Sequence, residues 1–320
     1  MPFKPQTMFW PGTRAILLVH GIGDASTGRD GAFPIETTRK ILGDEAERTA
    51  LYHLNYDFIN DWLATKVQFE SGVRAVKEAL KGKLLGDDST GHISDYIGDV
   101  IWPVMSPDLR FAVRDAFLAQ LQQMQIDRGE SALSRGDDPL DYQISIIAHS
   151  LGCFHTYEVL TAAAEEPAHQ LRPASDLCTY DSVILMASPV QLIRTVAGLI
   201  GPLVPDVASL ATLAKPLAIP SETRRGKTVF CTKDFISVTG THDPVGGHVL
   251  GRKLDWAYMD IPGQHSVVVS QLALDIDSSE GTATALAHAF AAGGPSVKDP
   301  HSWSAYLDAQ AKVLRGVLLT

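Results

Sequence analysis

The sequence predicts an α/β protein with a mainly parallel central sheet flanked by helices. Continuous aliphatic runs such as Ala15–Val19 are typical of strands that are buried on both faces, as in parallel sheets. These runs alternate along the chain with segments of helical periodicity. That order favours parallel strands joined by helical crossovers.

The length and composition suit one large domain. The chain has 320 residues, of which 45% are hydrophobic and 20% are charged, an ordinary balance for a protein with a sizeable core. We expect a single domain over residues 1–320, with insertions at about 57–139 and about 190–222.

Charge and targeting signals narrow the classes of partner. The formal net charge of −10 disfavours nucleic acid, because no basic stripe is present to meet phosphates. Residues 1–12 lack the pattern of a secretory signal peptide, and no metal-type cysteine spacing is present. We therefore expect a cytoplasmic protein with reduced thiols, no metal and no cofactor.

The first half of the chain contains five expected elements. Strands are predicted at Ala15–Val19 and Ala50–Tyr56. Apolar residues with a period near 3.6 predict helices over Trp62–Lys81 and around Leu109–Leu121. The polar stretch Ser131–Pro139 is expected to be a surface connection.

The second half continues the alternation. A strand at Tyr142–Ala148 leads into Ser150, and a helix is expected from there to Glu166, before Pro167. The remaining expected elements are strands at Asp181–Ala187, Lys227–Thr239 and Val267–Leu274, and a terminal helix that begins near Ser302.

An apolar segment separates two of these strands. Residues 190–220 carry only Arg194, Asp206 and Lys215 as charges. Its charge-free stretches fall short of the roughly 20 residues that span a bilayer, so we expect no transmembrane segment. A helical cap over an apolar cleft fits the composition, and a second core is the alternative.

Ser150 lies directly after a strand and directly before a helix. A sharp turn in that context lifts a serine hydroxyl clear of the sheet, as the nucleophile-elbow motif requires. Small residues must flank such a turn, and Ala148 and Gly152 meet this need. The alternative is a serine that only caps the helix.

A glycine-rich turn follows the first strand, in the order His20-Gly21-Ile22-Gly23. Acyl transfer builds negative charge on a carbonyl oxygen, which fixed backbone N–H groups stabilise. The amides of Ile22 and Leu151 are the candidates for this oxyanion hole. Phosphate binding is a weaker interpretation, because the spacing of a dinucleotide site and a P-loop lysine are both missing.

Three motifs together carry a family resemblance. The segments Leu18–Gly23, Ile147–Gly152 and Met186–Pro189 resemble the α/β-hydrolase superfamily, and within it the lipase- and esterase-like members. The resemblance covers most of the chain, from about Ala15 onward. It implies the α/β-hydrolase fold and a triad in the chain order Ser, Asp or Glu, His. Ala148 departs from the family's usual glycine.

The resemblance also suggests which residues complete the triad. Its acid would lie just after the strand that follows the cap, where Asp243 stands; Asp234, inside that predicted strand, is the alternative. Its base would be His301, before the terminal helix. His265 is the alternative base and would lie at the wrong end of Val267–Leu274 if that strand is parallel.

These residues predict a serine hydrolase that cleaves carboxylic esters through an acyl-enzyme. The apolar cap indicates a small ester or a lipid-like substrate. An acyltransferase or thioesterase would use the same triad. A non-catalytic binding protein on this fold is a third interpretation, since fold does not determine function.

Overall fold

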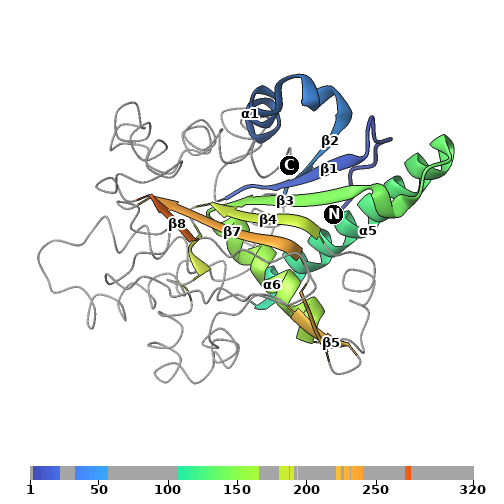
Figure 1. Ribbon diagram of the computed structural model, residues 1–320. Helices are drawn as coiled ribbons and strands as arrows, with labels where there is room; N and C mark the ends of the chain where they lie inside the picture. Colours follow the sequence, from blue (N-terminus) through green and yellow to red (C-terminus); the bar gives the residue numbers. More distant parts are fainter. Residues whose placement is uncertain are drawn as a thin grey trace, which may run out of the picture.

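A parallel sheet organises the part of the chain that the structure describes. In this computed structural model six strands lie in the order β2-β1-β3-β4-β7-β8, and every neighbouring pair is parallel (Figure 1). The strands are β1 (Arg14–Val19), β2 (Thr49–Leu54), β3 (Gln143–His149), β4 (Tyr180–Met186), β7 (Thr232–Gly240) and β8 (Gln271–Leu274). The described residues are 3–21, 33–56, 107–165, 180–186, 188–190, 193, 221–224, 227–230, 232–240 and 271–274. The predicted α/β class with a parallel sheet is confirmed.

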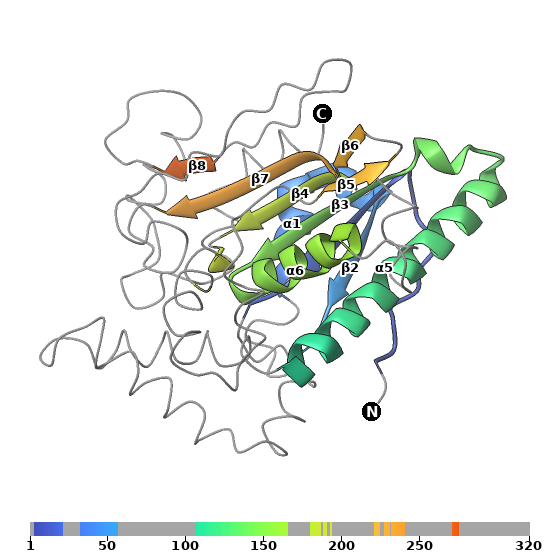
Figure 2. The same cartoon turned by 90° about the horizontal axis from the view of Figure 1, so that it is seen from below.

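Helices cover both faces of this sheet. They are α1 (Phe33–Leu42), α5 (Pro107–Arg135) and α6 (Leu151–Glu165), with short 3-10 turns η1 (Gly43–Arg48) and η2 (Pro139–Asp141). Helices α5 and α6 lie on one face and α1 on the other (Figures 1 and 2). In the described ranges, no helix combines the length and the apolar character needed to cross a bilayer. The predicted helices at Trp62–Lys81 and near Ser302, and residues 194–220 of the predicted cap, lie outside the described residues.

Helix α5 runs further than predicted. Ser131–Pro139 was expected to be a surface connection, but the helix continues to Arg135. Ser131 is fully buried, and its Oγ accepts a 2.9 Å hydrogen bond from the Trp10 amide. Gly136 ends the helix with a φ of 74°. Polar residues on a half-buried helix have the composition of a loop, and the glycine is the true stop signal.

The predicted strand Lys227–Thr239 is two strands in two different sheets. Strand β6 (Lys227–Phe230) pairs antiparallel with β5 (Ser221–Arg224), whereas β7 lies between β4 and β8. The prediction of one continuous strand is wrong. Both halves are rich in β-branched and aromatic residues, so strand propensity does not mark the point where the chain changes sheet.

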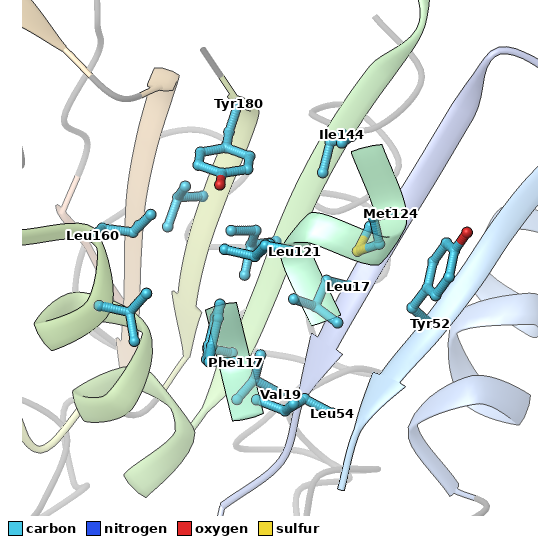
Figure 3. Close-up of a cluster of buried hydrophobic side chains, with 14 of the residues drawn as sticks. Leu17, Val19, Tyr52, Leu54, Phe117, Leu121, Met124, Ile144, Leu160 and Tyr180 are labelled. Carbon is cyan, nitrogen blue, oxygen red and sulfur yellow. The ribbon is translucent and has the colours of Figure 1, made fainter. Parts of the chain in front are cut away.

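Both faces of the sheet are buried, as continuous apolar strands require. Leu17 and Val19 of β1 face α5 and α6, while Ile16 and Leu18 alternate to the opposite face, and all four are fully buried. Figure 3 shows three α5 side chains, Phe117, Leu121 and Met124, against the sheet. Burial of each large apolar side chain contributes about 1.5–3 kcal/mol.

A buried carboxylate ties the segment before β1 to α5. Asp127 is 2% exposed, and its two oxygens accept four hydrogen bonds. The donors are Thr7 Oγ1 (2.9 Å), Gln123 Nε2 (2.8 Å), Met8 N (2.9 Å) and Tyr52 Oη (2.6 Å). Burial raises the pKa of Tyr52, so its hydroxyl stays protonated and can donate. The carboxylate therefore joins three segments that are distant in sequence.

Removing this carboxylate should destabilise the fold. Asp127→Ala leaves several buried donors without an acceptor, and we expect it to lower the free energy of unfolding by about 3 kcal/mol. Urea denaturation measures the loss. Asp115→Ala, at an exposed position of the same helix, is the matched control and should change stability by less than about 0.5 kcal/mol. Equal losses in the two variants would contradict the role of Asp127.

Candidate active site

The strand order places a switch point between β1 and β3. After β1 the chain adds β2 on one side, and after β3 it adds β4, β7 and β8 on the other. Open α/β sheets bind ligands at such a point, outside the carboxyl ends of the strands. Because Val19 pairs with Ala148, the residues that follow β1 and β3 emerge side by side. We call this edge of the sheet the carboxyl edge.

Ser150 stands at the carboxyl edge in a strained backbone conformation. It lies between β3 and α6 and has a φ of 51°, the only positive φ of a non-glycine residue in the described ranges. A serine that merely caps a helix has an extended backbone instead. The left-handed conformation costs about 1 kcal/mol or more and is concentrated at functional sites. This geometry therefore disfavours the capping interpretation.

Two glycines allow the backbones around Ser150 to approach one another. A Cβ on Gly152 would lie 2.6 Å from the carbonyl oxygen of Val19 and closer still to that of His20. A Cβ on Gly21 would lie 2.7 Å from the Cβ of Ser150. The first turn of α6 therefore rests directly on the end of β1, as the small residues in the sequence predicted.

A methyl group at Gly152 should be poorly tolerated. The clash is with backbone atoms that cannot move away, so Gly152→Ala is expected to cost about 3 kcal/mol of unfolding free energy. Gly129→Ala is the matched control, because nothing lies within 4 Å of a Cβ there. In the middle of α5 it should stabilise the protein by about 0.5–1 kcal/mol. Thermal or urea unfolding of both variants tests the contrast, and a Gly152→Ala variant as stable as wild type would refute the close approach.

Leu151 begins α6 at the same edge. Amides in the first turn of a helix have no acceptor within that helix, and the helix dipole adds partial positive charge there. The Leu151 side chain is fully buried, which holds this end of the helix against the sheet. Its backbone N–H is therefore suited to stabilise an anion beside Ser150, and its role as an oxyanion donor stays a prediction.

A cluster of buried rings lies behind the turn after β1. The ring of Tyr56 stacks on His20 at 4.4 Å and 9°, and meets His155 of α6 edge-on at 5.1 Å. His53 of β2 contacts His20 edge-on at 5.2 Å. Sequence reasoning missed this cluster. Its signal was Tyr56 at the end of the predicted strand Ala50–Tyr56, on the same alternation as Tyr52 and Leu54.

Burial keeps these histidines neutral. It lowers the pKa of His20 to about 3, with the nearby His53 adding to the effect, and it lowers the pKa of His53 to about 4. Burial also lowers the pKa of His155 to about 3, with Arg110 and His20 as smaller causes. These rings resist protonation at neutral pH, so they are poorly suited to take a proton from Ser150.

The neutral rings predict an acid-sensitive fold. An unfolded histidine has its ordinary pKa of 6.5, so the unfolded state takes up protons first as the pH falls. The stability held by the neutral rings is complete above pH 6.5 and is lost between there and about pH 3, with His53 completing its share near pH 4. The loss should approach about 1.4 kcal/mol per histidine for each pH unit.

Urea unfolding at pH 7.5, 6.5 and 5.5 measures this dependence. His155→Phe removes one titrating ring and keeps an aromatic contact for Tyr56, so its stability should fall less steeply with pH than that of wild type. An identical slope in the two proteins would show that His155 titrates normally in the folded state.

The other predicted site residues fall in different places. Asp234 lies inside β7, where it pairs with Ser182. Val238, four residues further along β7, pairs with Met186 near the carboxyl edge. Asp234 therefore lies four residues before that edge. Strand β8 is parallel to β7, and a parallel strand disfavours His265 as the base. Ile22, Asp243, His265 and His301 lie outside the described residues. Of the predicted site, the structure therefore describes Ser150 and Leu151.

Comparison of the chain with protein-family models, with curated proteins and with solved structures yields no match. Within the described ranges, no group of three or more His, Cys, Asp or Glu side chains is arranged to hold a metal ion.

Proposed function

We propose that this chain is a serine hydrolase of the α/β-hydrolase fold that cleaves carboxylic esters through an acyl-enzyme on Ser150. The observation that carries the proposal is the φ of 51° at Ser150, in a turn between a parallel strand and a helix at the switch point of the sheet. A strained serine at this position is the arrangement that presents a nucleophile above the sheet.

The strand register supports Asp243 as the acid over Asp234. Val238 is level with Met186 and therefore with His149, while β7 continues to Gly240. Two strand spacings, about 10 Å, separate β3 from β7. Three extended residues beyond Gly240 span up to about 10 Å, which is sufficient for Asp243 to approach Ser150. Asp234 is four residues before Val238 in β7, which at about 3.3 Å per residue places it about 13 Å further from the level of His149.

The buried histidines favour a base from elsewhere in the chain. His20 and His155 have pKa values of about 3, whereas a general base works best with a pKa near the working pH. His301 remains our proposed base, and His265 the alternative. Asp243 would accept a hydrogen bond from the imidazole and stabilise the imidazolium that forms.

The reaction then proceeds in two halves. The base takes the proton from Ser150 Oγ as this oxygen attacks the ester carbonyl, and the amides of Leu151 and Ile22 stabilise the oxyanion. The C–O bond to the leaving alcohol breaks as the imidazolium returns the proton to that oxygen. Water, activated by the same base, attacks the acyl-enzyme and releases the acid. No metal or cofactor takes part.

The composition of the proposed cap points to a small ester with an aliphatic acyl group, or to a lipid-like substrate. Residues 190–220 are strongly apolar, and the histidines at the edge of the sheet are uncharged at neutral pH. Mainly apolar surroundings of this kind suit an apolar acyl group, which has no polar atoms that lose water on binding.

A fluorophosphonate probe and a series of p-nitrophenyl esters test the proposal. Wild type should be labelled covalently and should hydrolyse at least one ester, whereas Ser150→Ala should lose labelling and at least about 10³-fold in kcat/KM. His301→Ala should lose activity to a similar extent, and His265→Ala should retain it.

The outcomes separate the alternatives. If wild type neither reacts with the probe nor hydrolyses any ester, a non-catalytic binding protein becomes the better interpretation. If His265→Ala is inactive and His301→Ala active, the base is His265. A preference for long acyl chains would support the lipid-like substrate. Faster turnover with an added alcohol acceptor would instead identify an acyltransferase.

A further inference from the structure

We propose that Tyr56 is a positioning residue, whose hydroxyl sets the orientation of the oxyanion turn that follows β1. The inference rests on the proposed function, because an oxyanion turn has meaning only if Ser150 forms an acyl-enzyme. Tyr56 takes no part in the proposed triad. It lies just beyond β2, whereas the proposed oxyanion donors follow β1 and β3.

The hydroxyl of Tyr56 is directed at the backbone of this turn. Tyr56 Oη donates a 2.7 Å hydrogen bond to the carbonyl oxygen of His20 and lies 3.4 Å from that of Gly21. The side chain is fully buried, so water does not compete for these carbonyls. A single phenol therefore contacts two successive carbonyl groups of the turn.

The ring of His20 completes the arrangement. It stacks on Tyr56 at 4.4 Å, and its Nδ1 lies 2.7 Å from the Gly21 carbonyl oxygen. A carbonyl oxygen only accepts, so Nδ1 must carry the proton and the ring is the neutral Nδ1–H tautomer. Burial, which lowers the pKa of His20, favours this uncharged form. The carbonyl groups of His20 and Gly21 therefore both point toward the rings of Tyr56 and His20.

Holding these carbonyls matters because Gly21 has no side chain of its own to restrict it. A Cβ is excluded there by Ser150, so glycine is required, yet glycine can adopt many backbone conformations. In a planar trans peptide the N–H points opposite to the carbonyl. Fixing the carbonyls of the turn therefore also fixes the directions in which its N–H groups can donate.

Tyr56 also contacts the helix that carries the second oxyanion donor. Its ring meets His155 edge-on at 5.1 Å. His155 lies four residues after Leu151, one helical turn along α6, and both side chains are buried. Tyr56 thus lies between the two segments whose amides are proposed to stabilise the oxyanion, and it links the position of one to the other.

The test is Tyr56→Phe, which removes the hydroxyl and keeps the stacked ring. The oxyanion forms only in the transition state, so kcat for a p-nitrophenyl ester should fall about tenfold or more while KM changes by less than about twofold. The rate of fluorophosphonate labelling should fall with kcat, because the probe also places an oxygen in the oxyanion hole.

Tyr52→Phe is the matched control. Tyr52 lies on β2, four residues before Tyr56, and its hydroxyl donates to Asp127 of α5. Both variants lose a buried phenol hydroxyl and should show lower midpoints of urea unfolding. We expect only Tyr56→Phe to lose kcat. If Tyr56→Phe does not fold, His20→Leu removes the bond to the Gly21 carbonyl and carries the same expectation.

The outcomes distinguish this inference from the proposed function. If wild type neither labels nor hydrolyses esters, the proposed function fails and the role of Tyr56 fails with it. If wild type is active and Tyr56→Phe keeps its kcat, only the positioning role is overturned. A rise in KM alone, or an equal loss of kcat in Tyr52→Phe, would also overturn it by showing a binding or a general structural effect.

Discussion

The close approach of the segments that follow β1 and β3 at the switch point is the constraint on which the rest of the site depends. Gly152 brings the first turn of α6 onto the carbonyls at the end of β1, and Gly21 leaves room for Ser150 beside it. With these contacts in place, Ser150 is held at a φ of 51°, a conformation that a free chain would rarely adopt. The strained conformation persists because the sheet and the helix fix the positions of both ends of the turn.

Tertiary burial controls the electrostatics of this edge. In the described part of the chain, four histidines are buried: His20, His53, His149 and His155. Burial lowers the pKa values of His20 and His155 to about 3 and that of His53 to about 4. Neutral imidazoles act as flat rings that pack and donate single hydrogen bonds. The surroundings of Ser150 therefore combine uncharged rings with oriented backbone dipoles, which is the setting that the proposed oxyanion hole requires.

The sequence was most informative where one residue type has one physical explanation. Aliphatic runs marked β1 and β3, and small residues at Ala148 and Gly152 marked the turn around Ser150. It was least informative where polarity or propensity has two explanations. The polar residues after Ile126 concealed the continuation of α5, because a half-buried helix and a loop can share that composition. Strand propensity likewise could not show that β6 and β7 belong to different sheets.

The sequence by itself determined the parallel α/β architecture, the strand–turn–helix around Ser150 and the requirement for glycine beside it, because periodicity and side-chain size are local properties. Only the tertiary structure decided the strained φ of Ser150, the level of Asp234 below the carboxyl edge and the contacts of Tyr56 with His20 and His155. These depend on strand register and on residues brought together from distant segments. The direction of a phenol toward a carbonyl 36 residues away cannot be read from either segment alone.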